Sequence, residues 1–388
     1  MRFCLTAEEE KFREEVRDFL KCEATPEMIA ETMANGGLYG GPEGRKFIQK
    51  VGAKGWLTPT WPRKYGGIEA PEWSMYMIHD ELPYWEAPWA YIGARMSGPT
   101  ILRFANDELK DEFLPKIASG EIEMALGYTE PEAGSDLASL QMRAEDKGDY
   151  FLMNGQKVFN SHCHIADYHW LAARTDTNGP KHRGISMFIV DMHSPGITIR
   201  PLITVAGWRT NEVFYDNVKV PKRNLVGEMN RGFYYLMTAL DFERMFPMGA
   251  YRRLFDDVVE YIKTEKRNGI PLSKDPIVRQ QMADIAIDIE VTYLLYYQLS
   301  YLLDKEAIPN YQSSMQKLFS TEAVQRLTNT AMQVVGLYGQ LQADSKWAPL
   351  AGRIEYYYRN SLIETIYGGT SEIQRNIIAT RGLGLPIS

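Results

Sequence analysis

The chain has 388 residues, which is too long for one simple layered core, so we expect two or three packed subdomains. Apolar residues make up 45% and charged residues 24%, an ordinary composition for a soluble globular protein. The formal net charge of −7 argues against a nucleic acid or an anionic membrane as the main partner, and still allows a local basic pocket for a phosphorylated ligand.

Residues 1–120 predict helices. Thr6 and Glu9 have the spacing of a capping box, in which two side chains satisfy free amides at the start of a helix. Between residues 55 and 67, prolines and paired glycines predict a loop. The apolar residues after the capping box recur on one helical face: Phe12, Val16, Phe19 and Leu20. We therefore expect an N-terminal α-helical domain over residues 1–120.

Residues 121–227 predict strands separated by glycine and proline. Asn154-Gly155 between two short apolar runs predicts a hairpin with strands at 150–153 and 156–159, because Asn-Gly accepts the positive φ angles of a tight turn. Further strands are expected at His169–Arg174, Ile185–Asp191, Ile197–Leu202 and Val213–Val220. Several short strands at this spacing indicate a small β-barrel or sandwich.

Residues 228–388 return to helical periodicity. The apolar stripes are Leu254, Val258, Val259 and Ile262, then Ile285, Ile289, Tyr293 and Tyr296. Long amphipathic helices joined by short turns predict a four-helix bundle. The expected fold class is α+β, with an N-terminal helical domain, a central small β-barrel at 121–227 and a C-terminal four-helix bundle.

Residues 128–136 read Y-T-E-P-E-A-G-S-D. The hydroxyls of Thr129 and Ser135 can bond to the ring atoms of a flavin, and Gly134 allows a close approach of the backbone. The alternative is a surface loop that leads into a strand. The segment resembles the T-E-P-x-A-G-S-D signature of acyl-CoA dehydrogenases, where it covers the isoalloxazine ring. Leu126 and Tyr128 share this segment, and the resemblance implies that they also bind the cofactor.

Residues 154–161 read N-G-Q-K-V-F-N-S and resemble N-G-x-K-x-W-I-[ST] of the same family. In the family an aromatic ring shields the flavin and a hydroxyl bonds to it, which implies these roles for Phe159 and Ser161. Phenylalanine keeps the apolar shield but lacks the indole N–H of tryptophan. The alternative for Phe159 is an ordinary buried residue of a hairpin.

Residues 366–375 read I-Y-G-G-T-S-E-I-Q-R and resemble the family's I-Y-E-G-T-x-E-I-Q-R. Paired glycines at a helix start leave amides free for an anion or a polarised oxygen. The resemblance implies that Thr370 and Glu372 contact the FAD nucleotide, and the alternative is an ordinary turn into a helix. Gln333 and Gly336 match the family's Q-x-x-G-G-x-G, which meets the FAD diphosphate of a neighbouring subunit.

The resemblance covers essentially the whole chain, and Arg359 matches the arginine of the family's R-D-A segment. It implies an FAD-dependent enzyme that oxidises an acyl-CoA thioester between its α and β carbons. It also implies an electron-transfer flavoprotein as oxidant, and a homotetramer whose FAD sites are completed across subunits.

Gly368 departs from the family pattern, because many members carry their catalytic glutamate at this position. Isovaleryl and long-chain members place the base in an L-D-x-E-R segment instead, and residues 240–244 read L-D-F-E-R. Glu243 is therefore the candidate base, and burial should raise its pKa from about 4.3. The alternative is a solvated helix residue. The main-chain N–H of Gly368 still serves the thioester carbonyl, together with a ribityl hydroxyl of FAD.

The resemblance implies a set of substrate-binding residues. Asp241 and Arg244 match positions at the pantetheine end of CoA, and Arg95 could receive a substrate carboxylate, although a structural ion pair is the alternative. Abundant aromatics and the small residue at 368 hint at a branched, cyclic or aromatic acyl group. The other substrate-binding candidates are Ser135, Tyr367 and Gly369.

Two further segments need an interpretation. Residues 264–269 read T-E-K-R-N-G where the family has E-R-x-x-F-G, so Arg267 is the candidate substitute for the arginine that serves FAD. His162, Cys163, His164 and His169 are potential metal ligands, but no second ligand cluster exists and we expect no metal.

Two rival functions stay open. One is an oxidase or monooxygenase on the same scaffold, and the other is a non-catalytic or half-site subunit of a hetero-oligomer. A cytoplasmic location is expected, since the chain shows no secretory signal, no apolar run of about eighteen residues and no framework of cysteines.

Overall fold

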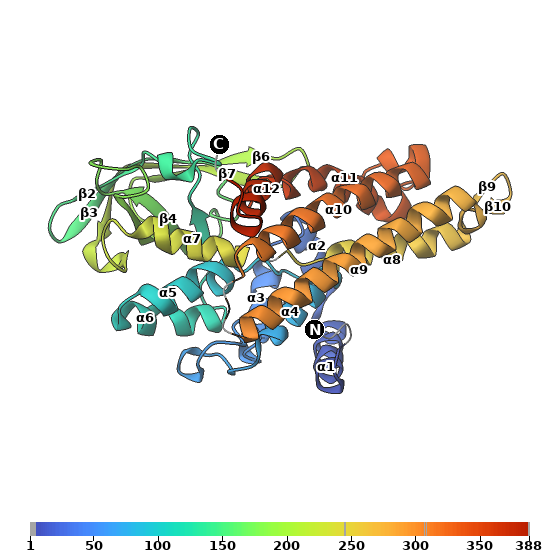
Figure 1. Ribbon diagram of the computed structural model, residues 1–388, viewed down its shortest axis with the longest axis horizontal. Coiled ribbons are helices and arrows are strands. Elements are labelled where there is room, and N and C mark those ends of the chain that lie inside the picture. The colour runs from blue at the N-terminus through green and yellow to red at the C-terminus, as the bar shows by residue number, and fades with distance from the viewer. Residues whose placement is uncertain (1–4, 244–245, 306, 308, 387–388) are drawn as a thin grey trace. The chain divides into compact units, whose positions relative to one another are not determined.

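The computed structural model describes residues 5–243, 246–305, 307 and 309–386, without the side chains of 238–243 (Figure 1). The chain forms two compact units. We call the first, made of Met1–Ala24, Glu72–Glu86 and Arg244–Ser388, the helical unit. The second, made of Thr25–Pro71 and Ala87–Glu243, is the mixed unit.

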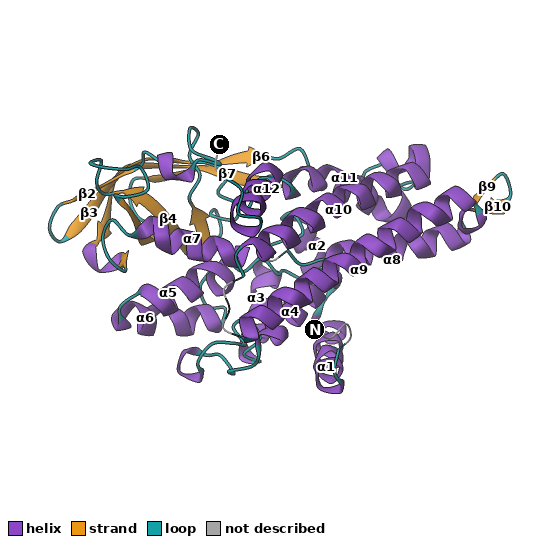
Figure 2. Ribbon diagram, in the orientation of Figure 1, coloured by secondary structure: helices purple, strands orange, loops and turns teal. Residues whose placement is uncertain are grey.

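The helical unit contains a short β9–β10 hairpin and otherwise helices and turns (Figure 2). Its helices are α1 (Ala7–Glu23), α4 (Glu72–Tyr84), α8 (Gly249–Thr264), α9 (Pro276–Asp304), α10 (Tyr311–Val335), α11 (Arg353–Glu364) and α12 (Ser371–Ile377). The hairpin strands are β9 (Lys266–Arg267) and β10 (Ile270–Pro271). The predicted capping box is confirmed at the start of α1, where Thr6 and Glu9 each accept from the other residue's amide.

The core of the helical unit confirms the predicted apolar stripes. Leu254, Val258 and Ile262 of α8 and Ile285 and Ile289 of α9 are buried in one cluster. Because these residues recur every three or four positions, each helix turns one continuous face to the others. The C-terminal motif at residues 366–375 lies between two helices of this unit, α11 and α12, and includes the start of α12.

The mixed unit packs helices around an eight-stranded sheet. Its helices are α2 (Pro26–Ala34), α3 (Pro42–Ala53), α5 (Gly98–Phe104), α6 (Asp107–Ala118) and α7 (Gly232–Glu243). Its strands are β1 (Met124–Gly127), β2 (Arg143–Asp146), β3 (Tyr150–Lys157), β4 (Tyr168–Arg174), β5 (Ile185–Asp191), β6 (Ile197–Ile203), β7 (Arg209–Pro221) and β8 (Leu225–Val226). The hydrogen-bonded order is β6-β7-β3-β2-β4-β5-β8, and β1 pairs in parallel with β4. Four predicted strands are confirmed as β4 to β7.

The predicted hairpin at Asn154-Gly155 is wrong. Residues 150–157 form one continuous strand, β3, which pairs with β2 on one edge and β7 on the other. The register with β7 shifts between Met153 and Gly155, as in a β-bulge. Gly155 has φ +148°, and an added Cβ would lie 2.8 Å from Met142 Cγ. The glycine therefore serves a bulge in a crowded sheet and not a turn.

None of the helices among the described residues is long and apolar enough to cross a membrane. The loop predicted between residues 55 and 67 contains only the short 3-10 turn Arg63–Tyr65.

Candidate active site

The first motif leaves the sheet at the end of β1, and its first residue, Tyr128, is fixed in the interior. The Tyr128 hydroxyl accepts a hydrogen bond from Trp170 Nε1 (2.8 Å), and the Tyr128 carbonyl accepts one from Lys157 Nζ (3.0 Å). Both Tyr128 and Trp170 are buried. The Tyr128 side chain therefore anchors the start of the loop in the mixed unit.

A buried ion pair joins the first two motifs. Lys157 Nζ lies 2.8 Å from Glu130 Oε1, and the Glu130 carboxylate also accepts from the amides of Gln141 (2.5 Å) and Met142 (2.9 Å). Burial lowers the pKa of Lys157 to about 8, although the carboxylate opposes this shift. We assigned no role to either residue from the sequence. The signal was available in part, because the first motif carries acidic residues and the second carries one lysine with no assigned partner.

The residues of this loop that are expected to approach a flavin are at least partly exposed. Thr129 is half-buried, and Gly134 and Ser135 are exposed. No atom outside the neighbouring residues lies within 4 Å of a Cβ built on Gly134. The glycine is therefore not required for packing within the chain, which leaves a close approach by a ligand as its expected use.

Gly134→Ala tests that use. We expect the thermal midpoint of the apoprotein to change by less than about 2 °C, because the added methyl group meets open space. We expect FAD affinity to fall about tenfold, since the methyl group would occupy the space of the ring. Flavin fluorescence titration measures the affinity. Unchanged affinity would remove Gly134 from the cofactor site.

The second motif presents an aromatic ring to the outside of the mixed unit. Phe159 is 62% exposed and has φ +57°, a left-handed conformation that a non-glycine residue rarely adopts. The alternative of a buried hairpin phenylalanine is therefore wrong. Ser161 Oγ lies 3.2 Å from Thr210 Oγ1, and the Leu126 carbonyl accepts from Asn160 Nδ2 (2.9 Å). An exposed ring beside hydroxyl groups fits a planar cofactor with polar edges.

The third motif forms a loop of the helical unit between α11 and α12. Gly368 and Gly369 have φ +61° and +91°, so two successive residues are left-handed. Thr370 is the N-cap of α12, where its hydroxyl accepts from the amide of Ile373 (3.3 Å). Glu372 is exposed in the first turn of this helix, and Tyr367 is half-buried.

Three residues predicted to serve FAD lie at or contact the end of α10, whereas Thr370 and Glu372 lie at the start of α12. Gln333 is exposed on the last turn, and Gly336 follows with φ +76°. Arg267, on β9, donates from Nη2 to the carbonyl of Val334 (3.0 Å). Arg359, by contrast, is paired with Glu355 one turn earlier on α11.

Part of the predicted site lies outside the described residues. Arg244 is not described, and Asp241 and Glu243 are described only as backbone of α7, without their side chains. Arg95 lies in the π-helical turn Gly93–Ser97 with its guanidinium 4.9 Å from the centre of the Trp89 ring. The roles of these four residues stay predictions.

The histidines near β4 are buried and uncharged. Burial lowers the pKa of both His162 and His169 to about 3 and raises that of the Cys163 thiol to about 12. His162 stacks on Tyr39 with ring centres 4.1 Å apart. Within the described part of the chain, no three His, Cys, Asp or Glu residues are placed to hold a metal ion.

Acid should destabilise the protein through His162. Its native pKa of about 3 lies below the unfolded value of about 6.5, so the unfolded chain binds more protons between these values. The stability it contributes is present above pH 6.5 and is lost as the pH falls toward 3. At about pH 5 we expect a loss of about 2 kcal/mol.

Urea unfolding at about pH 7 and about pH 5 checks this prediction. His162→Phe keeps a ring against Tyr39 and should reduce the pH dependence of the midpoint. His193→Phe is the matched control, because His193 is exposed. Equal pH dependence in wild type and His162→Phe would show that His162 is not the group responsible.

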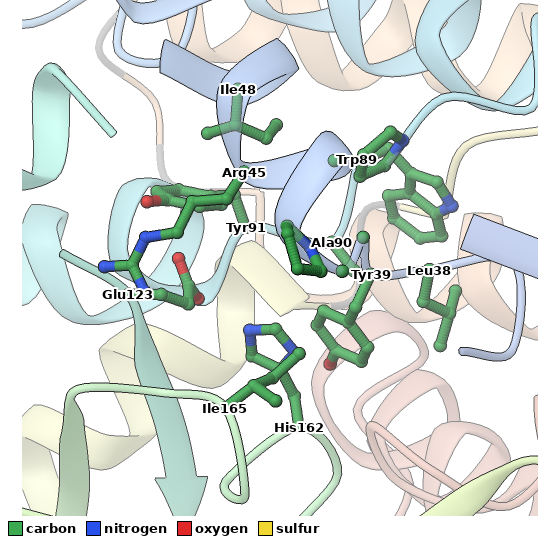
Figure 3. A pocket seen from close by; sticks show the side chains of 15 residues that line it. Leu38, Tyr39, Arg45, Ile48, Trp89, Ala90, Tyr91, Glu123, His162 and Ile165 are labelled. Carbon is green, nitrogen blue, oxygen red and sulfur yellow. The ribbon is translucent and has the colours of Figure 1, made fainter. Parts of the chain in front are cut away.

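A cavity of about 290 Å³ lies in the mixed unit beside these histidines (Figure 3). Its apolar and aromatic wall includes Leu38, Tyr39, Ile48, Trp89, Tyr91 and Ile165. His162, which follows the predicted flavin-binding Ser161 directly in the chain, also lines it. No sequence pattern indicated this cavity, because its walls come from segments as distant as Leu38 and Ile165, which lie 127 positions apart in the chain.

The charged groups around this cavity are neutral or paired. Glu123 is buried, its Oε1 accepts from the amides of Ile92 (2.8 Å) and Gly93 (3.3 Å), and burial raises its pKa well above the ordinary value. Arg45 Nη2 lies 2.6 Å from Asp167 Oδ2. His162 is neutral, so the lining suits an uncharged apolar group.

Comparison with known proteins agrees with this geometry. Family models for the N-terminal, middle and C-terminal domains of acyl-CoA dehydrogenases match residues 6–121, 125–218 and 230–383. The chain belongs to the acyl-CoA dehydrogenase family. It is an FAD-dependent acyl-CoA dehydrogenase with the fold of that family, as predicted from the three motifs.

The most similar proteins include an enzyme and two solved structures. Acyl-CoA dehydrogenase FadE26 of Mycobacterium tuberculosis is 36% identical, covering 100% of this chain and 99% of that protein. The Tcur3481–Tcur3483 steroid ACAD is 34% identical with a TM-score of 0.93 over 100% of both chains. The ChsE4–ChsE5 complex from Mycobacterium tuberculosis is 34% identical with a TM-score of 0.92, again over 100% of both chains.

Proposed function

We propose that Glu243 is the base that removes the α-proton of the acyl-CoA. The observation that carries this assignment is Gly368, which stands where many family members hold a glutamate and has no side chain. Glu243 closes α7 in the L-D-F-E-R segment, where other members of the family place their base. Bound FAD supplies an acceptor for the β-hydride.

The main chain at Gly368 supplies the second part of the mechanism. As the α-proton leaves, negative charge develops on the thioester oxygen, and a fixed N–H donor lowers the energy of this enolate. This role does not need a side chain, so it survives the glycine at 368. Asp241 and Arg244 hold the pantetheine end of CoA, which keeps the reacting carbons in place.

We further propose an acyl group that carries one or more rings. The cavity beside His162 supports this, because its wall is largely apolar and aromatic, His162 is neutral, and Arg45 is paired with Asp167. A 34% identical structure is a steroid ACAD, and another relative is a cyclohexane-1-carbonyl-CoA dehydrogenase of Geobacter metallireducens. A panel of acyl-CoA thioesters tests the proposal by anaerobic bleaching of the flavin band.

We expect cyclic and polycyclic thioesters to have a kcat/KM at least about tenfold above that of a straight chain with equal carbon number. A preference for straight-chain thioesters would contradict the proposal of a ring-containing acyl group. It would not contradict the assignment as an acyl-CoA dehydrogenase. Trp89→Leu should reduce the preference, because it removes a flat wall of the cavity.

The electron acceptor is tested separately. Reoxidation of the reduced flavin by an electron-transfer flavoprotein much faster than by oxygen would exclude the oxidase alternative.

The assembly is proposed as four copies of this chain, which complete the FAD sites across subunits. The second candidate is assembly with a related chain, favoured by the two-protein composition of the ChsE4–ChsE5 complex. The mass and flavin content of the chain purified alone separate them. A tetramer with one FAD for each chain supports the first candidate, and a flavin-poor or insoluble product supports the second. A cytoplasmic location stays a prediction.

A further inference from the structure

Two buried side chains of the helical unit hold the glycine loop from within. Lys317 Nζ, on α10, donates to the carbonyls of Glu364 (2.8 Å) and Gly369 (3.0 Å). Gln374 Nε2, on α12, donates to the carbonyls of Gly368 (2.9 Å) and Gly369 (3.1 Å). Gln374 is fully buried and Lys317 is 2% exposed. All three carbonyls are thereby turned toward the interior of the unit.

This arrangement leaves the loop amides on the other side. In a trans peptide unit the C=O and the following N–H point in opposite directions, so the inward carbonyls of Gly368 and Gly369 direct the amides of Gly369 and Thr370 outward. The Gly368 amide belongs to the preceding peptide unit and is restrained through the Cα of Gly368. The amides of Gly368 and Gly369 donate to no residue that the structure describes. The left-handed φ of both glycines makes this conformation accessible.

The loop is also closely fitted to its support. A Cβ added at Gly369 would lie 2.5 Å from Gln374 Nε2. The Lys317 ammonium lies 5.5 Å from the centre of the Tyr367 ring, next to the loop. Tyr251 donates from its hydroxyl to Glu364 Oε1 (2.7 Å), at the end of α11 where Lys317 binds the carbonyl. The support therefore consists of several side chains in contact with the loop or with the end of α11, and Gln374 lies too close to Gly369 to admit a Cβ there.

We propose that Lys317 and Gln374 are positioning residues for the enolate of the substrate. By holding the carbonyls of Gly368 and Gly369 inward, they fix the position of Gly368 in the loop, and so the place from which its own amide binds the thioester oxygen. A preorganised donor stabilises developing charge without reorganisation during the reaction. The inference rests on the proposed role of the Gly368 amide, and it assigns the stabilisation of the enolate to residues that touch neither substrate nor flavin.

Enolate formation can be measured without turnover. A 3-oxoacyl-CoA has an acidic α-carbon, and its bound enolate is followed by near-ultraviolet absorbance across a pH titration of the FAD-loaded enzyme. We expect Lys317→Met and Gln374→Met to raise the apparent pKa of the bound ligand by about one unit or more, equivalent to about tenfold weaker ionisation. The ligand Kd of the un-ionised form should change less than about threefold.

Arg326→Met is the matched control on α10. Arg326 is half-exposed, pairs with Asp288, and should leave the enolate pKa unchanged. If Lys317→Met does not fold, Gln374→Met carries the test, because it removes a donor but no charge. An enolate pKa within about 0.3 units of wild type in a folded Gln374→Met protein would overturn the proposal and show a structural role only. A wild-type enzyme that does not ionise the ligand would instead refute the proposed function.

Discussion

Replacing Glu243 with glutamine should slow flavin reduction by the best acyl-CoA substrate about 10²–10⁴-fold, the usual contribution of a general base. Glutamine keeps the size of the side chain but cannot accept a proton. Gly368 cannot compensate, because it has no side chain. Flavin content and the Kd for a non-reacting acyl-CoA analogue should stay within about threefold of wild type. Anaerobic stopped-flow absorbance measures the reduction rate.

Glu260→Gln is a suitable control for this experiment, since Glu260 is an exposed residue of α8 that pairs with Lys263. It should reduce flavin at the wild-type rate. A Glu243→Gln rate within about tenfold of wild type, or about 1.4 kcal/mol of barrier, would show that the base lies elsewhere.

A second variant returns a carboxylate to position 368. Gly368→Glu added to Glu243→Gln should recover part of the lost rate, because many family members hold their base there. The recovery should be incomplete, since φ +61° strains a non-glycine residue by about 1–3 kcal/mol. No recovery at all would indicate that position 368 faces away from the α-carbon in this chain.

The predicted hairpin and the observed bulge at Asn154-Gly155 show the limit of sequence patterns. The Asn154-Gly155 pair indicates that the chain can adopt a positive φ here. A tight turn and a β-bulge can both use a positive φ, so the pair does not distinguish between them. The deciding factor is the pairing of β3 with β2 and β7, and the β7 partners lie about 60 residues away. Strands with alternating or continuous apolar patterns, such as Ile185–Asp191, were predictable because burial itself sets their pattern.

The site was predictable where its motifs are contiguous and not where it depends on distant partners. Residues 128–136 and 366–375 indicated the cofactor and the enzyme class. The pairing of Lys157 with Glu130 and the support of the glycine loop by Lys317 were not foreseen. Lys157 and Glu130 are 27 positions apart in the chain, and Lys317 and Gly369 are 52 positions apart. Only the folded chain brings either pair into contact.

Gly249→Ala should destabilise the protein strongly, although it only changes one hydrogen into a methyl group. Gly249 opens α8, and a Cβ there would lie 1.8 Å from the carbonyl oxygen of Asp80 and 2.9 Å from the amide nitrogen of Tyr84, both in α4. Both obstacles are backbone atoms, so no rotamer change can relieve the overlap. The two helices would have to move apart.

Separation of these helices would also break a buried polar cluster. The Asp80 carboxylate accepts from the amide of Met248 (3.1 Å) and the hydroxyl of Tyr293 (2.8 Å), and Arg252 Nη1 lies 3.4 Å from it. Leaving such groups without partners costs about 1–3 kcal/mol each. We therefore expect a total loss of at least about 3 kcal/mol and a fall in thermal midpoint of about 5–10 °C.

Differential scanning calorimetry of the apoprotein measures this midpoint, with Gly134→Ala as the control that adds the same methyl group in open space. The contrast between the two variants isolates the close approach of α8 to α4, because the chemical change is identical. A Gly249→Ala midpoint within about 2 °C of wild type would mean that the helices can separate cheaply. In that case the start of α8, and the polar cluster on Asp80, would not be rigid supports of the helical unit.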